Sequence, residues 1–310
     1  MSQPKFGFHY SRIENVIPPR KFAPLAEEMG FDSVWVPEAL VNETPAGDIL
    51  MTMSALVHHS SRITVGAGAV LLPLRNPVVL AKELATLDVH SEGRIIVGFG
   101  VGGPPDSHPD AFEACGVSLR ERGDRTDEAL KIMTKLWTGE PVDHQGKFQS
   151  FSNIRLEPRP HQRPHPPLWA GGVSERMLKR AARYTDGFYP VRINPEEYAA
   201  SWSRIVRYGE DLGRDVSGMA RGIHIFYLIG RNEEEARAAG ESELNRRRGF
   251  EVSLVSDGRY AFGSVADCAR TVERFLEVGV DHVVFNAMTP ADRVPEQLEL
   301  LVEGVVSRFR

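Results

Sequence analysis

The chain has 310 residues, 42% of them hydrophobic and 25% charged, and 37 Lys and Arg against 42 Asp and Glu give a formal net charge of −5. This composition excludes a disordered or collagen-like chain, and its acidic balance argues against a nucleic-acid-binding protein. No apolar run approaches the roughly 18 residues of a membrane span, so we expect no membrane segment. The start lacks the apolar stretch of a secretory signal, and two isolated cysteines, Cys115 and Cys268, form no disulfide framework. Both features predict a cytoplasmic protein.

Eight short runs read as β-strands, and most are apolar throughout, as is typical of parallel strands buried on both faces. In chain order they are residues 5–10, 32–36, 63–71, 94–99, 168–170, 187–191, 222–229 and 281–286.

Helical patterns lie between these runs, and several carry recognisable start signals. Pro24 is expected to open the first helix, Asn76 and Asn194 each stand as N-caps before a proline, and Ser264 with Asp267 resembles a capping box. The segment 233–253 is charged and predicts a surface helix.

Strict alternation of strand and helix predicts right-handed βαβ units and a parallel sheet. Eight units in about 300 residues suit an α/β fold of the (β/α)8 TIM-barrel type with insertions, and a doubly wound open sheet is the rival. No composition break divides the chain, so residues 1–310 read as one domain. The stretch 139–167 is too long for a plain loop, and we interpret it as an insertion containing a hairpin that turns at Gln145 and Gly146.

Three glycine-rich segments follow or interrupt predicted strands. Residues 98–103 satisfy G-x-G-x-x-G, but a proline pair follows and no helical pattern begins before about Ser118, whereas a dinucleotide site needs a helix there. Residues 171–174 (GGVS) end a strand and open a helix, which favours an anion site, although a tight turn with a serine cap explains them equally. Residues 66–70 (GAGAV) indicate a bulge or close ligand approach, or simply small-residue packing inside the barrel.

Two polar residues stand where barrel enzymes place their chemistry, at the C-terminal ends of predicted strands. These are His9 and Glu38. The remaining histidines lack the spacing of a zinc site, so no protein metal site is predicted. No nucleophilic serine or cysteine motif is present either. His9 and Glu38 are therefore the candidate catalytic residues, with an internal hydrogen-bonding role as the alternative for His9.

Longer stretches carry a family likeness. The segment 63–70 (ITVGAGAV), the segment 75–82 (RNPVVLAK) and the segment 86–100 (TLDVHSEGRIIVGFG) are the most distinctive. Further support comes from residues 30–38 (GFDSVWVPE), 122–128 (RGDRTDE), 171–174, 186–188 and 279–284. Together these resemble the luciferase-like monooxygenase superfamily over essentially the whole chain, and the loop 71–77 (LLPLRNP) is most similar to its F420-dependent branch.

The resemblance implies a barrel that binds the deazaflavin F420, with FMN as the alternative cofactor, in a homodimer. Carried over by position, a non-proline cis peptide between Gly68 and Ala69 would lie behind the ring of the cofactor. The turn formed by Gly100, Val101 and Gly102 would flank the ring or ribityl chain. The cofactor phosphate would be held by Gly171, Gly172, Val173 and Ser174.

One departure from the family concerns the proton relay. Many members carry a histidine directly after the acid of the second strand, but here Ala39 follows Glu38. Glu38 itself, or His9 across the barrel mouth, is expected to substitute.

These features predict an oxidoreductase that transfers a hydride between reduced F420 and a small organic substrate. An FMN-dependent monooxygenase that uses oxygen is the first alternative, and a non-catalytic flavin-binding barrel is the second. Substrate specificity is expected to reside in the loops and the insertion.

Overall fold

The structure is a computed structural model, and it describes residues 3–11, 13, 15–38, 40–41, 46–102, 109–248 and 257–310. The last two residues of the 109–248 range are described in their backbone only.

Parallel strands close into a barrel. In chain order the barrel strands are β1 Lys5–His9, β2 Ser33–Val36, β3 Thr64–Leu71, β4 Ile95–Gly100, β7 Leu168–Ala170, β8 Gly187–Phe188, β9 Ala220–Ile229 and β11 His282–Ala287. Hydrogen bonding follows the order β9-β11-β1-β2-β3-β4-β7-β8, and a pairing of β8 with β9 closes the ring. The predicted (β/α)8 barrel is confirmed, and closure excludes the open sheet.

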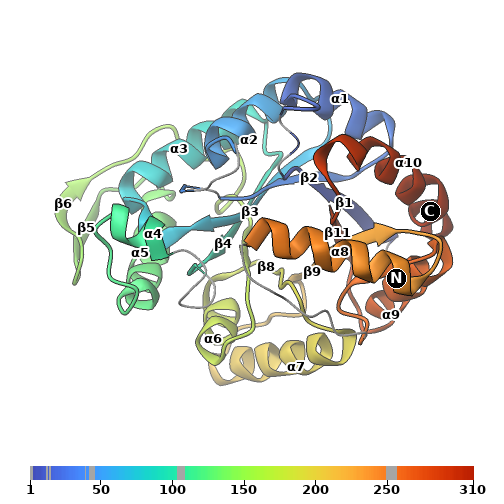
Figure 1. The fold of residues 1–310 in the computed structure, drawn as a ribbon. Coiled ribbons are helices and arrows are strands. Elements are labelled where there is room, and N and C mark those ends of the chain that lie inside the picture. The colour runs from blue at the N-terminus through green and yellow to red at the C-terminus, as the bar shows by residue number, and fades with distance from the viewer. Residues whose placement is uncertain are drawn as a thin grey trace.

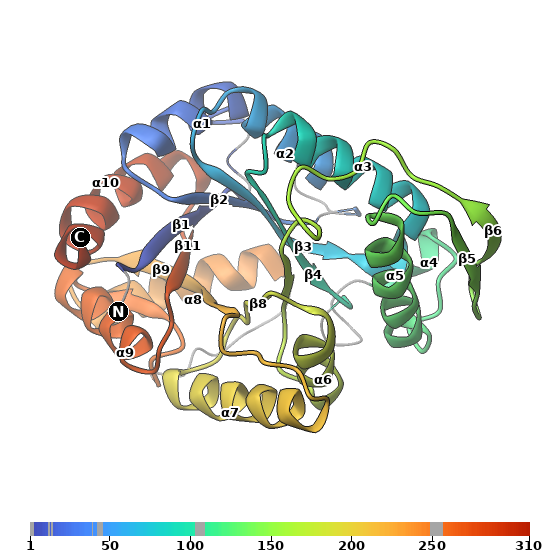
Figure 2. The same cartoon turned by 180° about the vertical axis from the view of Figure 1, so that it is seen from behind.

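Helices surround the barrel, as Figures 1 and 2 show from opposite sides. They are α1 Pro19–Glu28, α2 Ile49–His58, α3 Pro77–His90, α4 Pro109–Ala114, α5 Arg122–Leu136, α6 Glu175–Tyr184, α7 Pro195–Asp211, α8 Glu233–Arg248, α9 Val265–Glu277 and α10 Val294–Gly304. Short 3-10 turns are η1 Leu72–Leu74, η2 Ala291–Arg293 and η3 Val306–Phe309.

The predicted helix caps are largely correct. Asn76 accepts hydrogen bonds from the first turn of α3, and capping boxes at Asn194 and Ser264 open α7 and α9. The predicted start of α1 is wrong: the helix begins at Pro19, which suits its first position, and Pro24 lies inside it. The expectation of no helix before about Ser118 is also wrong, because α4 begins at Pro109.

Two features are added to the barrel. Strand β10, Ala261–Gly263, pairs in parallel with β9 outside the ring. The expected insertion contains an antiparallel hairpin of β5, Val142–Gln145, and β6, Ser150–Ile154. The Glu128 carboxylate on α5 accepts backbone N–H bonds from residues 147–149 at 2.8–3.1 Å. One half-buried side chain of the helical layer thereby fixes the hairpin turn.

Aromatic rings fill the interior of the barrel below its C-terminal mouth. Trp35 stacks on Tyr189 with centroids 4.3 Å apart and contacts Trp169 at 5.2 Å. A Cβ atom on Gly66 would lie only 2.5 Å from the Trp35 ring. The small-residue interpretation of this glycine is therefore correct, since Gly66 makes room for the indole.

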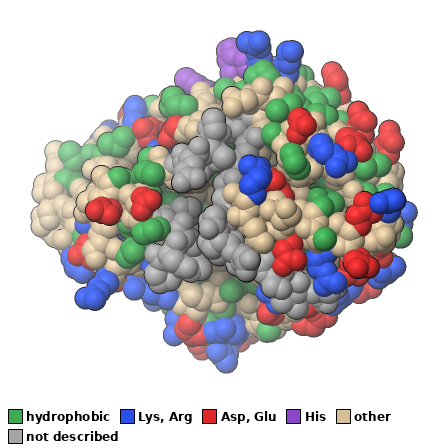
Figure 3. Space-filling view, viewed as in Figure 1, with side chains coloured by type: hydrophobic (Ala, Val, Ile, Leu, Met, Phe, Trp, Pro, Cys, Tyr) green, Lys and Arg blue, Asp and Glu red, His purple; other side chains and the backbone are tan. Residues whose placement is uncertain are grey.

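Charges of both signs are interspersed over the described surface visible in Figure 3. Within the described ranges, we find no helix whose length and apolar character would let it cross a membrane.

Candidate functional site

A cavity of about 800 Å³ lies at the C-terminal mouth of the barrel. All eleven candidate site residues line it: His9, Glu38, Gly68, Ala69, Gly100, Val101, Gly102, Gly171, Gly172, Val173 and Ser174. They come from β1, β3 and β4 and from the segments that follow β2, β4 and β7. Parallel strands end at one rim, so residues far apart in the chain meet there.

Backbone rather than side chain forms one wall of the cavity. The register between β3 and β4 shifts between Ala67 and Val70, which marks the predicted bulge, and the Gly68–Ala69 peptide is cis as expected. A Cβ atom on Gly100 would meet nothing closer than 3.9 Å. This wall offers a planar ligand a surface that carries few side-chain atoms.

The segment 171–174, here called the glycine turn, leads into α6. Gly172 has a φ of +101°, which favours glycine, and Ser174 caps the helix by accepting a hydrogen bond from the Met177 N–H at 3.3 Å. The first N–H groups of a helix have no acceptor within that helix and carry its positive dipole end. The turn therefore borders the cavity with the chemistry that suits an anion.

Three polar side chains form a connected group beside the backbone wall. His9 Nε2 lies 3.0 Å from the Gly68 carbonyl oxygen, and the Asn286 amide nitrogen lies 3.4 Å from His9 Nδ1 and 3.1 Å from His224 Nε2. The two imidazole rings stack with centroids 4.4 Å apart. Since Asn286 has two N–H donors, one for each imidazole, this arrangement fixes the neutral tautomers. His9 then carries its proton on Nε2 and donates it to Gly68.

His224 is held neutral by its surroundings. Burial lowers its pKa well below the ordinary value, and the neighbouring His9 and Arg192 lower it further. Both imidazoles of the stack line the cavity.

Glu38 lies in the same cavity, but its carboxylate is engaged by a neighbouring loop. Arg75 donates to both of its oxygens, at 2.6 and 3.1 Å, and the Leu71 N–H donates at 3.2 Å. Although burial by itself lowers the pKa of Arg75, pairing with Glu38 and Asp48 raises it. In this structure Glu38 acts as an acceptor that fastens the end of β3.

Sequence reasoning missed several residues that line the cavity, among them Asn286, His224 and Arg192. Asn286 could have been found by the criterion that selected His9, because it is a polar residue near the end of a barrel strand. His224 lies in the middle of the long strand β9, and Arg192 follows a two-residue strand, so neither stands out in the sequence.

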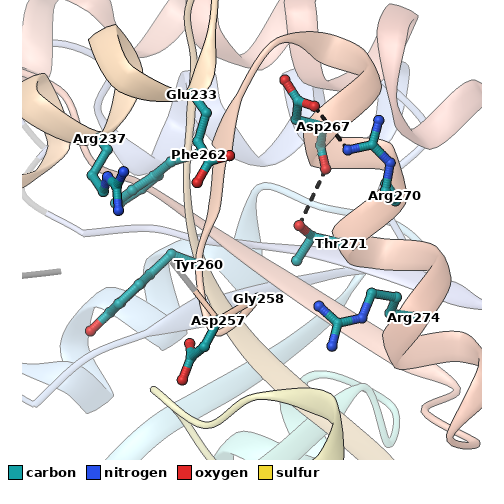
Figure 4. Close-up of a pocket in the computed structure, with 10 residues that line it drawn as sticks. All are labelled: Glu233, Arg237, Asp257, Gly258, Tyr260, Phe262, Asp267, Arg270, Thr271 and Arg274. Atoms are coloured by element: carbon teal, nitrogen blue, oxygen red, sulfur yellow. Dashed lines mark hydrogen bonds and ion pairs between the residues drawn. The ribbon is translucent and has the colours of Figure 1, made fainter. Parts of the chain in front are cut away.

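A second cavity of about 320 Å³ lies on the outside of the barrel between α8, β10 and α9 (Figure 4). Two of its arginines are already paired, Arg270 with Asp267 at 3.0 Å and Arg274 with Glu196 at 2.7 Å. No candidate site residue lies there. Over the described part of the chain, His, Cys, Asp and Glu residues form no group of three or more that could hold a metal ion.

The residues of the main cavity fit a flavin or deazaflavin. A bare backbone wall at residues 68–69 and 100 suits a flat ring, and the glycine turn suits a phosphate at the far end.

A family model described as luciferase-like monooxygenase matches residues 19–261. The chain belongs to the luciferase-like monooxygenase family. Relatives found by comparison include a phthiodiolone/phenolphthiodiolone dimycocerosates ketoreductase from Mycobacterium sp. (strain JLS), which is 27% identical over 247 residues. The match covers 72% of this chain and 64% of the ketoreductase, so the chain spans less than two thirds of the length of that relative.

Three solved structures share the luciferase-like fold over nearly all of the chain. The monooxygenase RslO1 from Streptomyces bottropensis has a TM-score of 0.83 at 24% identity, covering 99% of this chain and 100% of the other. An F420-dependent secondary alcohol dehydrogenase, solved with an F420–acetone adduct, has a TM-score of 0.81 at 22% identity and 99% coverage of both chains. The oxygenating constituent of 3,6-diketocamphane monooxygenase from Pseudomonas putida, solved with FMN, has a TM-score of 0.74 at 19% identity and the same coverage.

Proposed function

We propose that this chain is an F420-dependent oxidoreductase that interconverts a carbonyl and a secondary alcohol on a small organic substrate. The observation that carries the proposal is the cavity itself, which is lined by a backbone wall, the glycine turn and a stacked histidine pair. The ketoreductase relative and the neighbour that holds an F420–acetone adduct support this direction of chemistry.

When bound, the reduced deazaflavin supplies the hydride. The chain's own residues would position the cofactor and the substrate and protonate the substrate oxygen. The bulge at Gly68 and Ala69 and the turn around Gly100 and Val101 would support the ring, and the glycine turn would hold the phosphate. These contacts fix the orientation of both reactants, which is a main source of rate enhancement.

We assign proton transfer at the substrate oxygen to His9. Its Nε2–H borders the cavity and is held in that tautomer by Asn286. A substrate oxygen near the Gly68 carbonyl would compete for the hydrogen bond of this Nε2–H. Once His9 has gained a second proton from solvent, it can give the Nε2 proton to the oxygen formed by hydride transfer, and a neutral imidazole remains. Glu38 takes the positioning role, because its ion pair with Arg75 anchors the chain that leaves the bulge.

The test begins with titration of cofactor-free protein by F420 and by FMN, followed by fluorescence quenching. Reduced F420 and acetone are then incubated without oxygen, and F420 formation is followed by absorbance. We expect tight F420 binding and ketone-dependent oxidation of reduced F420 in the absence of oxygen.

Two results would overturn the proposal. Preferential FMN binding with oxygen-dependent product formation would support the monooxygenase alternative. Cofactor binding without turnover of any carbonyl or alcohol would support a non-catalytic flavin-binding barrel.

A further inference from the structure

Arg192 is a cation of the cavity for which the described residues supply no acidic partner. Within the part of the chain that the structure describes, the Arg192 guanidinium makes no hydrogen bond or ion pair, although it is half-buried and lines the cavity. By contrast, the Glu38 carboxylate of the cavity is paired with Arg75. Burial lowers the pKa of Arg192, because removal from water disfavours the charged form.

The backbone that carries Arg192 is fixed in place. Val191 forms a parallel bridge with His224, and the Arg192 backbone has a left-handed φ of 58°. Its carbonyl oxygen accepts a hydrogen bond from Arg259 Nη1 at 3.1 Å, and Arg259 is paired with Asp257. A left-handed arginine held at both sides is a position that the fold maintains rather than a loose loop residue.

Arg192 follows β8, which lies between β7 and β9 in the barrel. It acts electrostatically on His224 and Tyr260, which belong to β9 and to the segment before β10. The anion site of the glycine turn follows β7 instead. Arg192 and the glycine turn thus belong to different segments at the rim of the same cavity.

Apolar side chains share the cavity with Arg192. Leu244 and Met288 belong to a buried cluster between α8 and β9, and Phe226 packs against that cluster. All three line the cavity beside Val191. A charged group next to an apolar wall suits a ligand with an anionic head and a hydrocarbon body.

We propose that Arg192 binds the carboxylate or a comparable anionic group of the substrate, so that the enzyme acts on organic anions with an apolar body. This deepens the proposed function and rests on it for the reaction. A guanidinium pairs with a carboxylate through two parallel N–H bonds, and such charge-assisted bonds are strong where water is excluded. The anion would supply the counter-charge that the described residues do not supply.

The experiment measures binding without turnover. Calorimetric titrations use 4-phenylbutanoate and its neutral analogue 4-phenylbutanamide on the protein saturated with F420, and again on cofactor-free protein. The variants are Arg192→Gln, Arg192→Lys and, as a matched loss of charge from an exposed site, Arg231→Gln. Circular dichroism and thermal unfolding establish that each variant is folded.

We expect the wild type to bind the anion at least tenfold more tightly than the amide, and Arg192→Gln to remove that preference. Arg192→Lys should keep part of the preference, and Arg231→Gln should keep all of it. F420 affinity should change less than twofold in every variant, because the glycine turn serves the cofactor.

Equal binding of anion and amide to the wild type would refute the proposal. So would an anion preference that survives in Arg192→Gln. A drop in F420 affinity with no change for the anion would assign Arg192 to the cofactor instead. Anion binding is also measured on cofactor-free protein. The role of Arg192 can therefore be judged even if the protein does not use F420.

Discussion

A negative charge placed at the glycine turn should weaken binding of any cofactor that carries a phosphate. Replacing Gly172 by Asp puts a carboxylate on a Cβ atom that has space, since the nearest atom, Met177 Cγ, would be 3.8 Å away. The φ of +101° strains any side chain there, but this cost is present in the free and the bound protein and cancels in the affinity.

The expected magnitude follows from Coulomb's law. A carboxylate on Gly172 would lie about 5 Å from a phosphate held by the turn, and at an effective dielectric constant of about 20 the repulsion is about 3 kcal/mol. Solvent screening at the open mouth reduces it, so we expect a loss of about 1.5–3 kcal/mol, or roughly 10- to 150-fold in Kd.

The assay is fluorescence-quench titration of Gly172→Asp against Gly172→Asn, which has the same shape and backbone strain without the charge. FMN and F420 should bind the Asp variant at least tenfold more weakly than the Asn variant. Riboflavin, which lacks the phosphate, should bind both variants alike. Equal FMN and F420 affinities in two folded variants would refute the assignment of the phosphate to this turn.

Three further outcomes are expected. His9→Asn should lower kcat about 100-fold while the cofactor Kd stays within twofold, and normal turnover would remove His9 from the proton transfer. Glu38→Gln should lower the free energy of unfolding by about 1–3 kcal/mol in denaturant titrations, because Arg75 loses the charge of its partner, whereas Glu296→Gln in an exposed pair should change it by less than about 0.5 kcal/mol. Burial alone would raise the pKa of Glu27, but hydrogen bonds from residues 61–63 lower it from 4.5 to about 2. The stability that the Glu27 carboxylate contributes is therefore present above pH 4.5 and is lost as the pH falls toward 2. Glu27→Gln should reduce the loss of unfolding free energy over this pH window by an amount on the order of 1 kcal/mol. An unchanged acid transition would contradict the assignment.

Much of the fold could be predicted because its signals are local. Buried parallel strands are continuous apolar runs, and the barrel strands were expected within about two residues of their observed bounds, apart from the short β8. N-caps such as Asn76 and Asn194 act on the residues that directly follow them. By contrast, β10 has three residues and no pattern of its own, since it exists only because the edge of β9 is available beside it.

The candidate site was predictable in position but not in its pairings. Glycine segments and polar residues at strand ends showed which residues border the mouth, and all of them line the cavity. The partner of Glu38 is Arg75 on a later loop, and the partners of His9 come from β3 and β11. Such contacts depend on barrel closure, which brings together segments up to 277 residues apart. The spacing of residues in the sequence does not predict these pairs.

The layer of aromatic rings below the mouth affects how this protein can change over evolutionary time. Trp35, Trp169 and Tyr189 fill the barrel, and under them Ser33 and His282 are joined by a buried hydrogen bond of 2.7 Å. Folding free energy is thus concentrated beneath the rim, independently of the loops above it. Loops at the mouth can accept insertions and new side chains with little loss of stability. Mutation can therefore alter the substrate range of such a barrel while its packed interior stays the same.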